Sequence, residues 1–152
     1  TTPGLQWFEK QAVRIGGGDT HRFRLDDCAM IKDNHIAIVG SIEDAVRRVR
    51  DHVSFTKKVE VEVESSDDAV RAAEAGADII LLDNMSPDTI RNTLEELEGR
   101  GLRGDVIVEA SGGIKPDNIE DYASTGVEVI SMGFITSSAC PVDLSLEIRE
   151  LK

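Results

Sequence analysis

Aromatic residues and cysteines are scarce in this sequence. Phe, Trp and Tyr make up 4% of its 152 residues, so any core must be built from aliphatic side chains. Cys28 and Cys140 lie far apart and no C-x-x-C spacing occurs, which argues against a zinc site or a redox pair. We therefore expect both cysteines to be reduced and structural.

The sequence also lacks long apolar runs and an excess of basic residues. No segment is long enough to cross a bilayer, and no basic stretch followed by an apolar one predicts a signal peptide. The 29 acidic and 17 basic residues give a net charge of −12, which argues against binding nucleic acid or an anionic membrane. We expect a cytoplasmic protein whose partners are small molecules bound by a local cluster of charges.

Beyond residue 40, amphipathic runs with helical period alternate with short runs rich in β-branched residues. Helix-start signals are the capping box that begins at Ser41, the serines before Asp67, and the prolines at 87 and 116. The predicted helices cover residues 41–53, 69–75, 86–98 and 116–124, and the predicted strands are Lys58–Glu64, Asp78–Asp83, Val106–Ala110 and Val127–Met132. Repeated strand–helix units predict an α/β fold with parallel strands, as an open sheet or a barrel. Polar or glycine residues at each strand end favour the barrel.

Both ends of the chain carry apolar side chains without an evident partner. A helix over residues 5–15 must pack against something, and Leu144, Leu146 and Ile148 alternate with polar residues as in a half-buried strand. We interpret residues 1–142 as an α/β-barrel catalytic domain of a two-domain protein. Residues 143–152 are predicted to form a strand that pairs with an N-terminal domain absent from this chain.

A glycine-rich stretch near the N-terminus holds cations that an acidic protein must keep for a reason. Gly16-Gly17-Gly18 is followed by His21 and Arg22, and then by Lys32-Asp33-Asn34-His35. Bare backbone beside cationic side chains suits a small anionic ligand. The alternative is a surface turn with solvated cations.

Carboxylates occur near the ends of three predicted strands. Glu62 lies in Val59–Glu64, where valines and glutamates alternate, Asp83 ends the next strand, and Glu109 lies near the end of the third. Because parallel strands end at one edge, these carboxylates are expected to converge there, where they could hold Mg²⁺ or sugar hydroxyls. The alternatives are a solvated strand face and caps of the following helices.

Glycine turns follow two of the same strands. Ser111-Gly112-Gly113 and Gly133 are placed where backbone amides can hold a phosphate. Glycines also serve ordinary turns, so this signal alone is weak.

Five motifs occur in order along the chain: Gly16-Gly17-Gly18-x-x-His21-Arg22, Lys32-Asp33-Asn34-His35, Glu60-Val61-Glu62-Val63, Leu82-Asp83-Asn84 and Ser111-Gly112-Gly113-Ile114. Together they closely resemble the quinolinate phosphoribosyltransferase family, also called carboxylating nicotinate-nucleotide pyrophosphorylases, over nearly the whole chain. The resemblance implies a two-domain enzyme of NAD biosynthesis with an N-terminal sandwich and a C-terminal open α/β barrel, assembled as a homodimer or a multiple of it. It implies transfer of phosphoribose from phosphoribosyl pyrophosphate to quinolinate, with Mg²⁺ as cofactor and with pyrophosphate and CO₂ released.

The resemblance also assigns residues to roles. It implies that His21 and Arg22 contact the quinolinate carboxylates and that Lys32 lies between quinolinate and the pyrophosphate. Glu62 and Asp83 match the pair that holds the ribose hydroxyls and Mg²⁺, so Lys32, Glu62 and Asp83 are the expected catalytic residues. The implied phosphoribosyl pyrophosphate contacts are Glu62, Asp83, Ser111, Gly112, Gly113 and Gly133.

Two other interpretations remain open from the sequence. One is a molybdenum-transport-associated paralogue of the same fold, and the other is a non-catalytic barrel module. The family's Arg-Lys pair directly precedes its Thr-Pro-Gly segment, and this sequence begins at Thr1. We therefore expect little or no activity from this chain alone.

Overall fold

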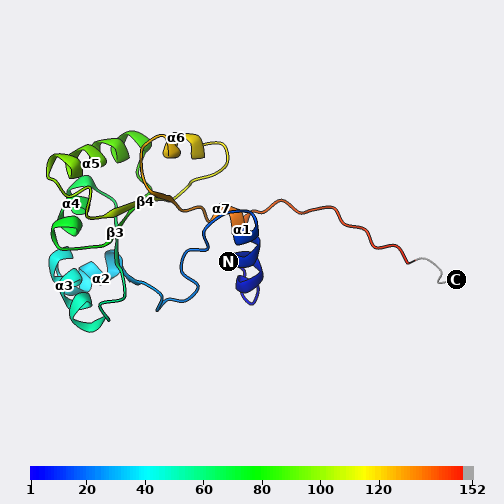
Figure 1. The fold of residues 1–152 in the computed structure, drawn as a ribbon, viewed down its shortest axis with the longest axis horizontal. Coiled ribbons are helices and arrows are strands. Elements are labelled where there is room, and N and C mark those ends of the chain that lie inside the picture. Colours follow the sequence, from blue (N-terminus) through cyan, green and yellow to red (C-terminus); the bar gives the residue numbers. More distant parts are fainter. Residues whose placement is uncertain (149–152) are drawn as a thin grey trace.

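The computed structural model describes residues 1–148, in which one parallel sheet forms the centre (Figure 1). Its five strands follow the spatial order β1-β2-β3-β4-β5. They are β1 (Ala29–Ile31), β2 (Val59–Val63), β3 (Ile79–Asp83), β4 (Ile107–Ser111) and β5 (Val129–Ile130). Every neighbouring pair is parallel, and β1 and β5 are the free edges of the sheet over the described residues. The predicted α/β fold with parallel strands is confirmed as an open sheet, and the barrel that the strand ends favoured is not closed over the described residues.

Seven helices accompany the sheet in the described part of the chain. They are α1 (Gln6–Ile15), α2 (Asp33–Val39), α3 (Ile42–His52), α4 (Ser66–Glu74), α5 (Pro87–Gly99), α6 (Ile119–Ala123) and α7 (Phe134–Ser137). In Figure 1, α3, α4 and α5 lie on one side of the sheet, and α1 and α7 lie on the other.

Serine side chains begin three of the helices where the sequence predicts it. Ser41, Ser65 and Ser86 each accept a hydrogen bond from the backbone N–H three residues later, at 3.1, 3.2 and 3.2 Å. These bonds satisfy an N–H that has no partner within the helix. Helix α4 begins at Ser66, earlier than expected, because Ser65 alone is the cap.

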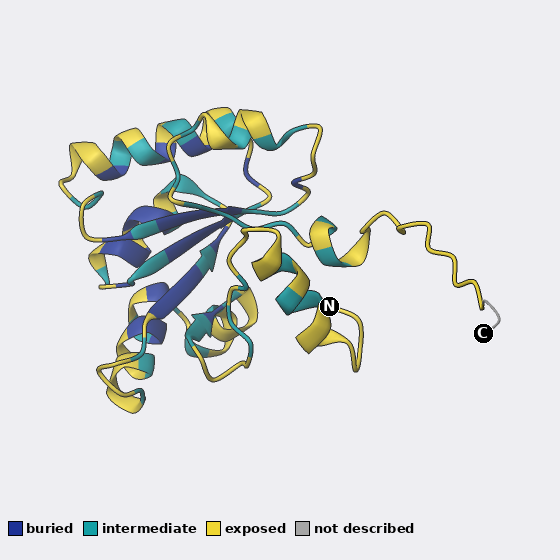
Figure 2. Ribbon diagram, turned by 45° about the vertical axis from the view of Figure 1, so that its right-hand side comes forward, coloured by how far each residue is buried: buried dark blue, intermediate teal, exposed yellow. Residues whose placement is uncertain are grey.

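The core lies between the sheet and the helices α3, α4 and α5. Val59, Val61 and Val63 of β2 point into it and are buried, as are Ile80 and Leu82 of β3. The buried hydrophobic side chains among residues 1–148 are Ile, Leu, Val, Ala and Met, which confirms the aliphatic core. Figure 2 shows the buried strands at the centre and exposed surfaces on the outer helices. Since strand side chains alternate between faces, the glutamates of β2 must lie on the opposite face.

Several elements differ from the sequence-based expectations. The strand expected over Val127–Met132 is only Val129–Ile130, and the helix expected from Pro116 begins at Ile119 after a turn. The elements β1, α2 and α7 were not predicted, because each is short. Helix α2 follows Lys32, whose backbone N–H donates to Nδ1 of His35 at 3.0 Å. His35 is therefore a helix-capping residue.

The two chain ends expose apolar side chains, as Figure 2 shows. Trp7 and Phe8 on α1 are 60% and 64% exposed. Residues 143–148 form no strand, and Leu144, Leu146 and Ile148 are exposed. The pairing of residues 143–152 with a further domain stays a prediction, and residues 149–152 lie outside the described part. None of the described helices has the length and apolar character needed to span a membrane.

Candidate active site at the carboxyl edge of the sheet

The strand register brings the predicted acidic residues to one face of the sheet. Glu62 of β2 lies opposite Leu81 of β3, which in turn lies opposite Glu109 of β4. Asp83 lies opposite Ser111, two residues nearer the carboxyl edge. Paired residues of neighbouring strands point to the same face, so these side chains share the face that α3, α4 and α5 leave open. Glu62 and Asp83 lie toward the carboxyl edge as expected, whereas Glu109 shares their face but is buried.

Lys32 joins this edge from the end of β1. Its Nζ forms an ion pair with Oε2 of Glu62, and the two side chains are 42% and 19% exposed. Asp83 accepts a hydrogen bond from Nδ2 of Asn84 at 2.8 Å. A cation and two carboxylates therefore lie at the strand ends and remain accessible to a ligand.

A cleft of about 330 Å³ opens after β4 and β5, next to Asp83, whose strand partner Ser111 lines it. Its lining comprises Ser111, Gly112, Gly113, Ile114, Lys115, Ser131, Gly133, Phe134, Ser137 and Ser138. All four residues expected to hold the phosphate are among them. The lining offers hydroxyls, glycine backbone and one cation, and no carboxylate, which suits an anion. Lys115 and Ser131 were not singled out from the sequence.

Gly112 holds the turn that ends β4 close to the end of β3. Its φ is +93°, and a Cβ built there would lie 2.4 Å from Oδ1 and 2.7 Å from the backbone N of Asn84. The backbone N–H of Asn84, itself at φ +54°, donates to the carbonyl of Ser111 at 2.9 Å. Only glycine fits both this conformation and this close approach. The tight turn brings Asp83 and the cleft together.

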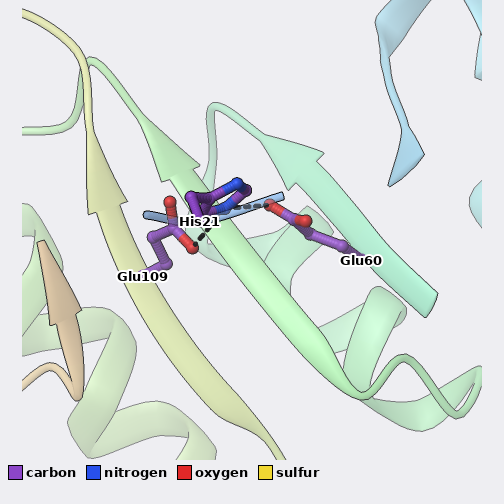
Figure 3. A group of neighbouring side chains, drawn as sticks. All are labelled: His21, Glu60 and Glu109. Atoms are coloured by element: carbon purple, nitrogen blue, oxygen red, sulfur yellow. Dashed lines mark ion pairs between the residues drawn. The ribbon is translucent and has the colours of Figure 1, made fainter. Parts of the chain in front are cut away.

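His21 lies over β3 between two buried carboxylates (Figure 3). Its Nε2 is 3.5 Å from Oε2 of Glu109 and 4.0 Å from Oε1 of Glu60. Lys10 of α1 donates to the backbone carbonyls of Thr20 and Arg22, on either side of the histidine. The loop is thereby fixed above the sheet, with His21 at φ +50°.

The electrostatics of this cluster follow from burial and charge. The hydrogen bond and the charge of Glu109 raise the pKa of His21 despite its partial burial. Burial raises the pKa of Glu60, and the neighbouring carboxylate of Glu109 adds to the effect. The contact with Glu109 thus stabilises the protonated form of His21 relative to that of a free histidine.

From the sequence, Glu60 had no expected role and Glu109 was expected at the carboxyl edge of the sheet. Both are buried instead, with 0% and 2% of their surface exposed. The alternation along β2 could have indicated that Glu60 belongs to the site, because Glu60 points to the same face of the sheet as Glu62. The loop from Gly16 to Cys28 covers this face, which no local pattern predicts.

Arg22 occupies a different position from the other expected site residues. Its Nη2 lies 3.3 Å from Sδ of Met30, and it lines a separate cleft of about 510 Å³ with Gln6 and residues 23–26. This cleft shares no lining residue with the one beside Gly112. The structure thus groups Lys32, Glu62, Asp83 and the glycine cleft at one edge, and places Arg22 near α1.

Residues 1–147 match the family model described as quinolinate phosphoribosyl transferase, C-terminal domain. The chain is 93% identical over 152 residues to a probable carboxylating nicotinate-nucleotide pyrophosphorylase of Methanothermobacter thermautotrophicus, and covers 54% of that protein. It is 45% identical over 148 residues to the carboxylating nicotinate-nucleotide pyrophosphorylase of Homo sapiens. This alignment covers 97% of this chain and 49% of the human protein.

The same relationship holds for solved structures. The crystal structure of NadC from Streptococcus pyogenes superposes with a TM-score of 0.83 at 46% identity, over 91% of this chain and 47% of that one. The chain thus spans about half the length of the relatives it matches. Both the sequence and the fold match, and the chain belongs to the family of quinolinate phosphoribosyl transferase C-terminal domains.

Proposed function

We propose that this chain is the catalytic part of an enzyme of NAD biosynthesis that transfers phosphoribose from phosphoribosyl pyrophosphate to quinolinate. The products are nicotinate mononucleotide, pyrophosphate and CO₂. The observation that carries the proposal is that Lys32, Glu62 and Asp83 share the carboxyl edge of the sheet with a hydroxyl- and glycine-lined cleft free of carboxylates. The names of the relatives, carboxylating nicotinate-nucleotide pyrophosphorylases, support it.

The proposed roles follow from the charges that develop in the reaction. The bond from the ribose C1′ to the pyrophosphate oxygen breaks with its electron pair leaving on pyrophosphate, and the quinolinate nitrogen bonds to C1′. Glu62 and Asp83 stabilise the positive charge that builds on the ribose, and Lys32 stabilises the departing pyrophosphate. Preorganised charges of this kind are worth about 3–4 kcal/mol each. The resulting pyridinium then loses one carboxylate as CO₂, and the electron pair left on that ring carbon takes up a proton from water.

The glycine cleft holds a phosphate of the same substrate. Backbone amides of Gly112, Gly113 and Gly133 and the hydroxyl of Ser111 line it. His21 and Arg22 bind the quinolinate carboxylates from the loop above the sheet, since Arg offers a two-pronged donor. His21 reaches toward the cleft through Glu109, which accepts a hydrogen bond from the cleft residue Ser131.

Mg²⁺ fits the carboxyl edge by its ligand chemistry. Glu62 and Asp83 offer carboxylate oxygens on neighbouring strands, and Mg²⁺ binds through one or two carboxylates together with phosphate oxygens and water. When bound, the ion would neutralise pyrophosphate charge. We also propose that the protein acts in the cytoplasm as a homodimer or a multiple of dimers, which is consistent with the exposed Trp7 and Phe8.

Calorimetry tests the proposal against the two alternatives. Phosphoribosyl pyrophosphate is titrated into the chain with and without Mg²⁺, and the expected result is binding that strengthens with the metal. Glu62→Gln should weaken this binding, whereas Glu43→Gln, which changes an exposed carboxylate on α3, should not. A molybdenum-transport-associated paralogue or a non-catalytic module would show no metal-dependent binding, and that result would refute the proposal.

A further inference from the structure

The carboxylates around His21 contain an unsatisfied buried atom. Oε1 of Glu60 is the one buried side-chain oxygen or nitrogen, over residues 1–148, that has no hydrogen-bond partner. The Glu60 side chain is fully buried, and this oxygen faces Nε2 of His21 at 4.0 Å (Figure 3). A buried carboxylate oxygen without a partner is costly, so this position calls for a ligand.

The groups around the cluster satisfy only its outer oxygens. The hydroxyl of Ser131 donates to Oε1 of Glu109, and the thiol of Cys28 lies 3.7 Å from Oε2 of Glu60. The inner oxygens, Oε2 of Glu109 and Oε1 of Glu60, both face the single Nε2 of His21. One ring nitrogen carries one proton or one lone pair, so His21 cannot serve both.

The spacing of these three atoms is close to that around a metal ion. A tetrahedral ion about 2.0–2.2 Å from its ligands holds them about 3.3–3.6 Å apart. The two distances from Nε2 are 3.5 and 4.0 Å, and all three atoms lie within 4.8 Å of one another. The two carboxylate oxygens lie within 4.8 Å of each other, so an ion would have to draw the Glu60 and Glu109 side chains together by up to about 1 Å, as well as the His21 loop.

We propose that His21, Glu60 and Glu109 form a binding site for one divalent transition-metal ion, of which Zn²⁺ is the probe. One imidazole nitrogen and two carboxylate oxygens favour Zn²⁺ or Mn²⁺ over Mg²⁺, which prefers oxygen ligands alone. Ser131 and Cys28 fix the outer oxygens, as partners of metal ligands do. The His21 side chain is 38% exposed, which leaves an open fourth position for water or a carboxylate.

This site is distinct from the Mg²⁺ position proposed above, because it uses neither Glu62 nor Asp83. It shares His21 with the proposed quinolinate contacts. The test therefore measures metal binding without either substrate, so that its outcome and the outcome of the functional proposal can be told apart.

The test is calorimetric titration of Zn²⁺ into the chelator-treated chain. We expect one bound ion per chain, with affinity at least about tenfold lower in His21→Ala, Glu60→Gln and Glu109→Gln. His52→Ala is the matched control, since His52 lies at the end of α3 and its Nδ1 contacts only the carbonyl of Arg48 among the described contacts, at 2.7 Å. This control should leave the affinity unchanged.

Three results would overturn the proposal: no Zn²⁺ binding by the wild-type chain, unchanged affinity in His21→Ala, or loss of affinity in His52→Ala. Circular dichroism of each variant checks that it folds. Should the buried Glu60 and Glu109 variants unfold, His21→Ala decides the question, because its side chain is partly exposed and contributes little to the core.

Discussion

Replacing Lys32 by alanine should reduce turnover much more than stability. The Lys32 and Glu62 side chains are 42% and 19% exposed, and a partly exposed ion pair contributes about 0–1 kcal/mol to stability. The hydrogen bond from the Lys32 backbone N–H to His35, which caps α2, survives the substitution. Loss of a charge that stabilises the leaving group costs about 3–4 kcal/mol in the transition state, or about 10²- to 10³-fold in kcat. The two effects therefore differ by more than about 2 kcal/mol.

Two assays separate these effects. Urea unfolding of the 152-residue chain gives the free energy of unfolding. Turnover is measured in a chimera in which this chain replaces the matching half of the Methanothermobacter relative, to which it is 93% identical. Lys57→Ala is the matched control, since Lys57 bonds the backbone carbonyl of Asp26 at 2.5 Å and lies outside the site. A fall in unfolding free energy of more than about 2 kcal/mol, or a loss of kcat below tenfold, would refute the reasoning.

Three further predictions concern the turn at Gly112, the Glu43–Arg71 ion pair and the Cys28 thiol. Gly112→Ala should lower the free energy of unfolding by about 1–3 kcal/mol. Gly133→Ala places its Cβ in open space, so it should weaken phosphoribosyl pyrophosphate binding without lowering the free energy of unfolding. Equal losses of unfolding free energy in the two variants would contradict this prediction. The hydrogen bond from Arg71 lowers the pKa of Glu43 to about 2. The wild type should therefore exceed Glu43→Gln in free energy of unfolding by its largest amount at neutral pH, and this difference should shrink as the pH falls from about 4.5 to about 2. Urea unfolding at a series of pH values measures this difference. A difference in unfolding free energy that grows on acidification would show that the Glu43–Arg71 pair is not formed. Burial raises the pKa of the Cys28 thiol to about 11. Iodoacetamide at pH 8 should therefore alkylate Cys28 far more slowly than the exposed Cys140, and mass spectrometry measures both rates. Equal alkylation rates would argue against the burial.

The sequence predicted the central part of the fold because local signals there agree with one another. Ser65, Ser86 and Pro87 mark helix starts, and the Val-Glu alternation of β2 marks a strand with two distinct faces. Each of these signals acts within a few residues, and the structure confirms them. The carboxyl-edge gathering of Glu62 and Asp83 followed from parallel topology alone.

The sequence could not predict features that depend on contacts between distant segments. Strand β1 has three residues, too few for a visible period, and it is a strand because it pairs with β2. The burial of Glu60 and Glu109 depends on a loop that arrives from α1, so it is invisible in either strand. Arg22 was grouped with His21 as its neighbour in sequence, and the charges of both side chains act on Glu60, although Arg22 also lines a cleft near α1.

Formation of nicotinate mononucleotide by the chimera is the most direct test of the central claim, that the carboxyl edge of this sheet is a phosphoribosyltransferase active site. Quinolinate, phosphoribosyl pyrophosphate and Mg²⁺ are supplied, and the product and the CO₂ released are measured together. The account predicts equal amounts of both, reduced about 10²-fold or more by Asp83→Asn. The 152-residue chain without the other half should show little or no turnover. An inactive but folded chimera, or full activity in Asp83→Asn, would contradict the account.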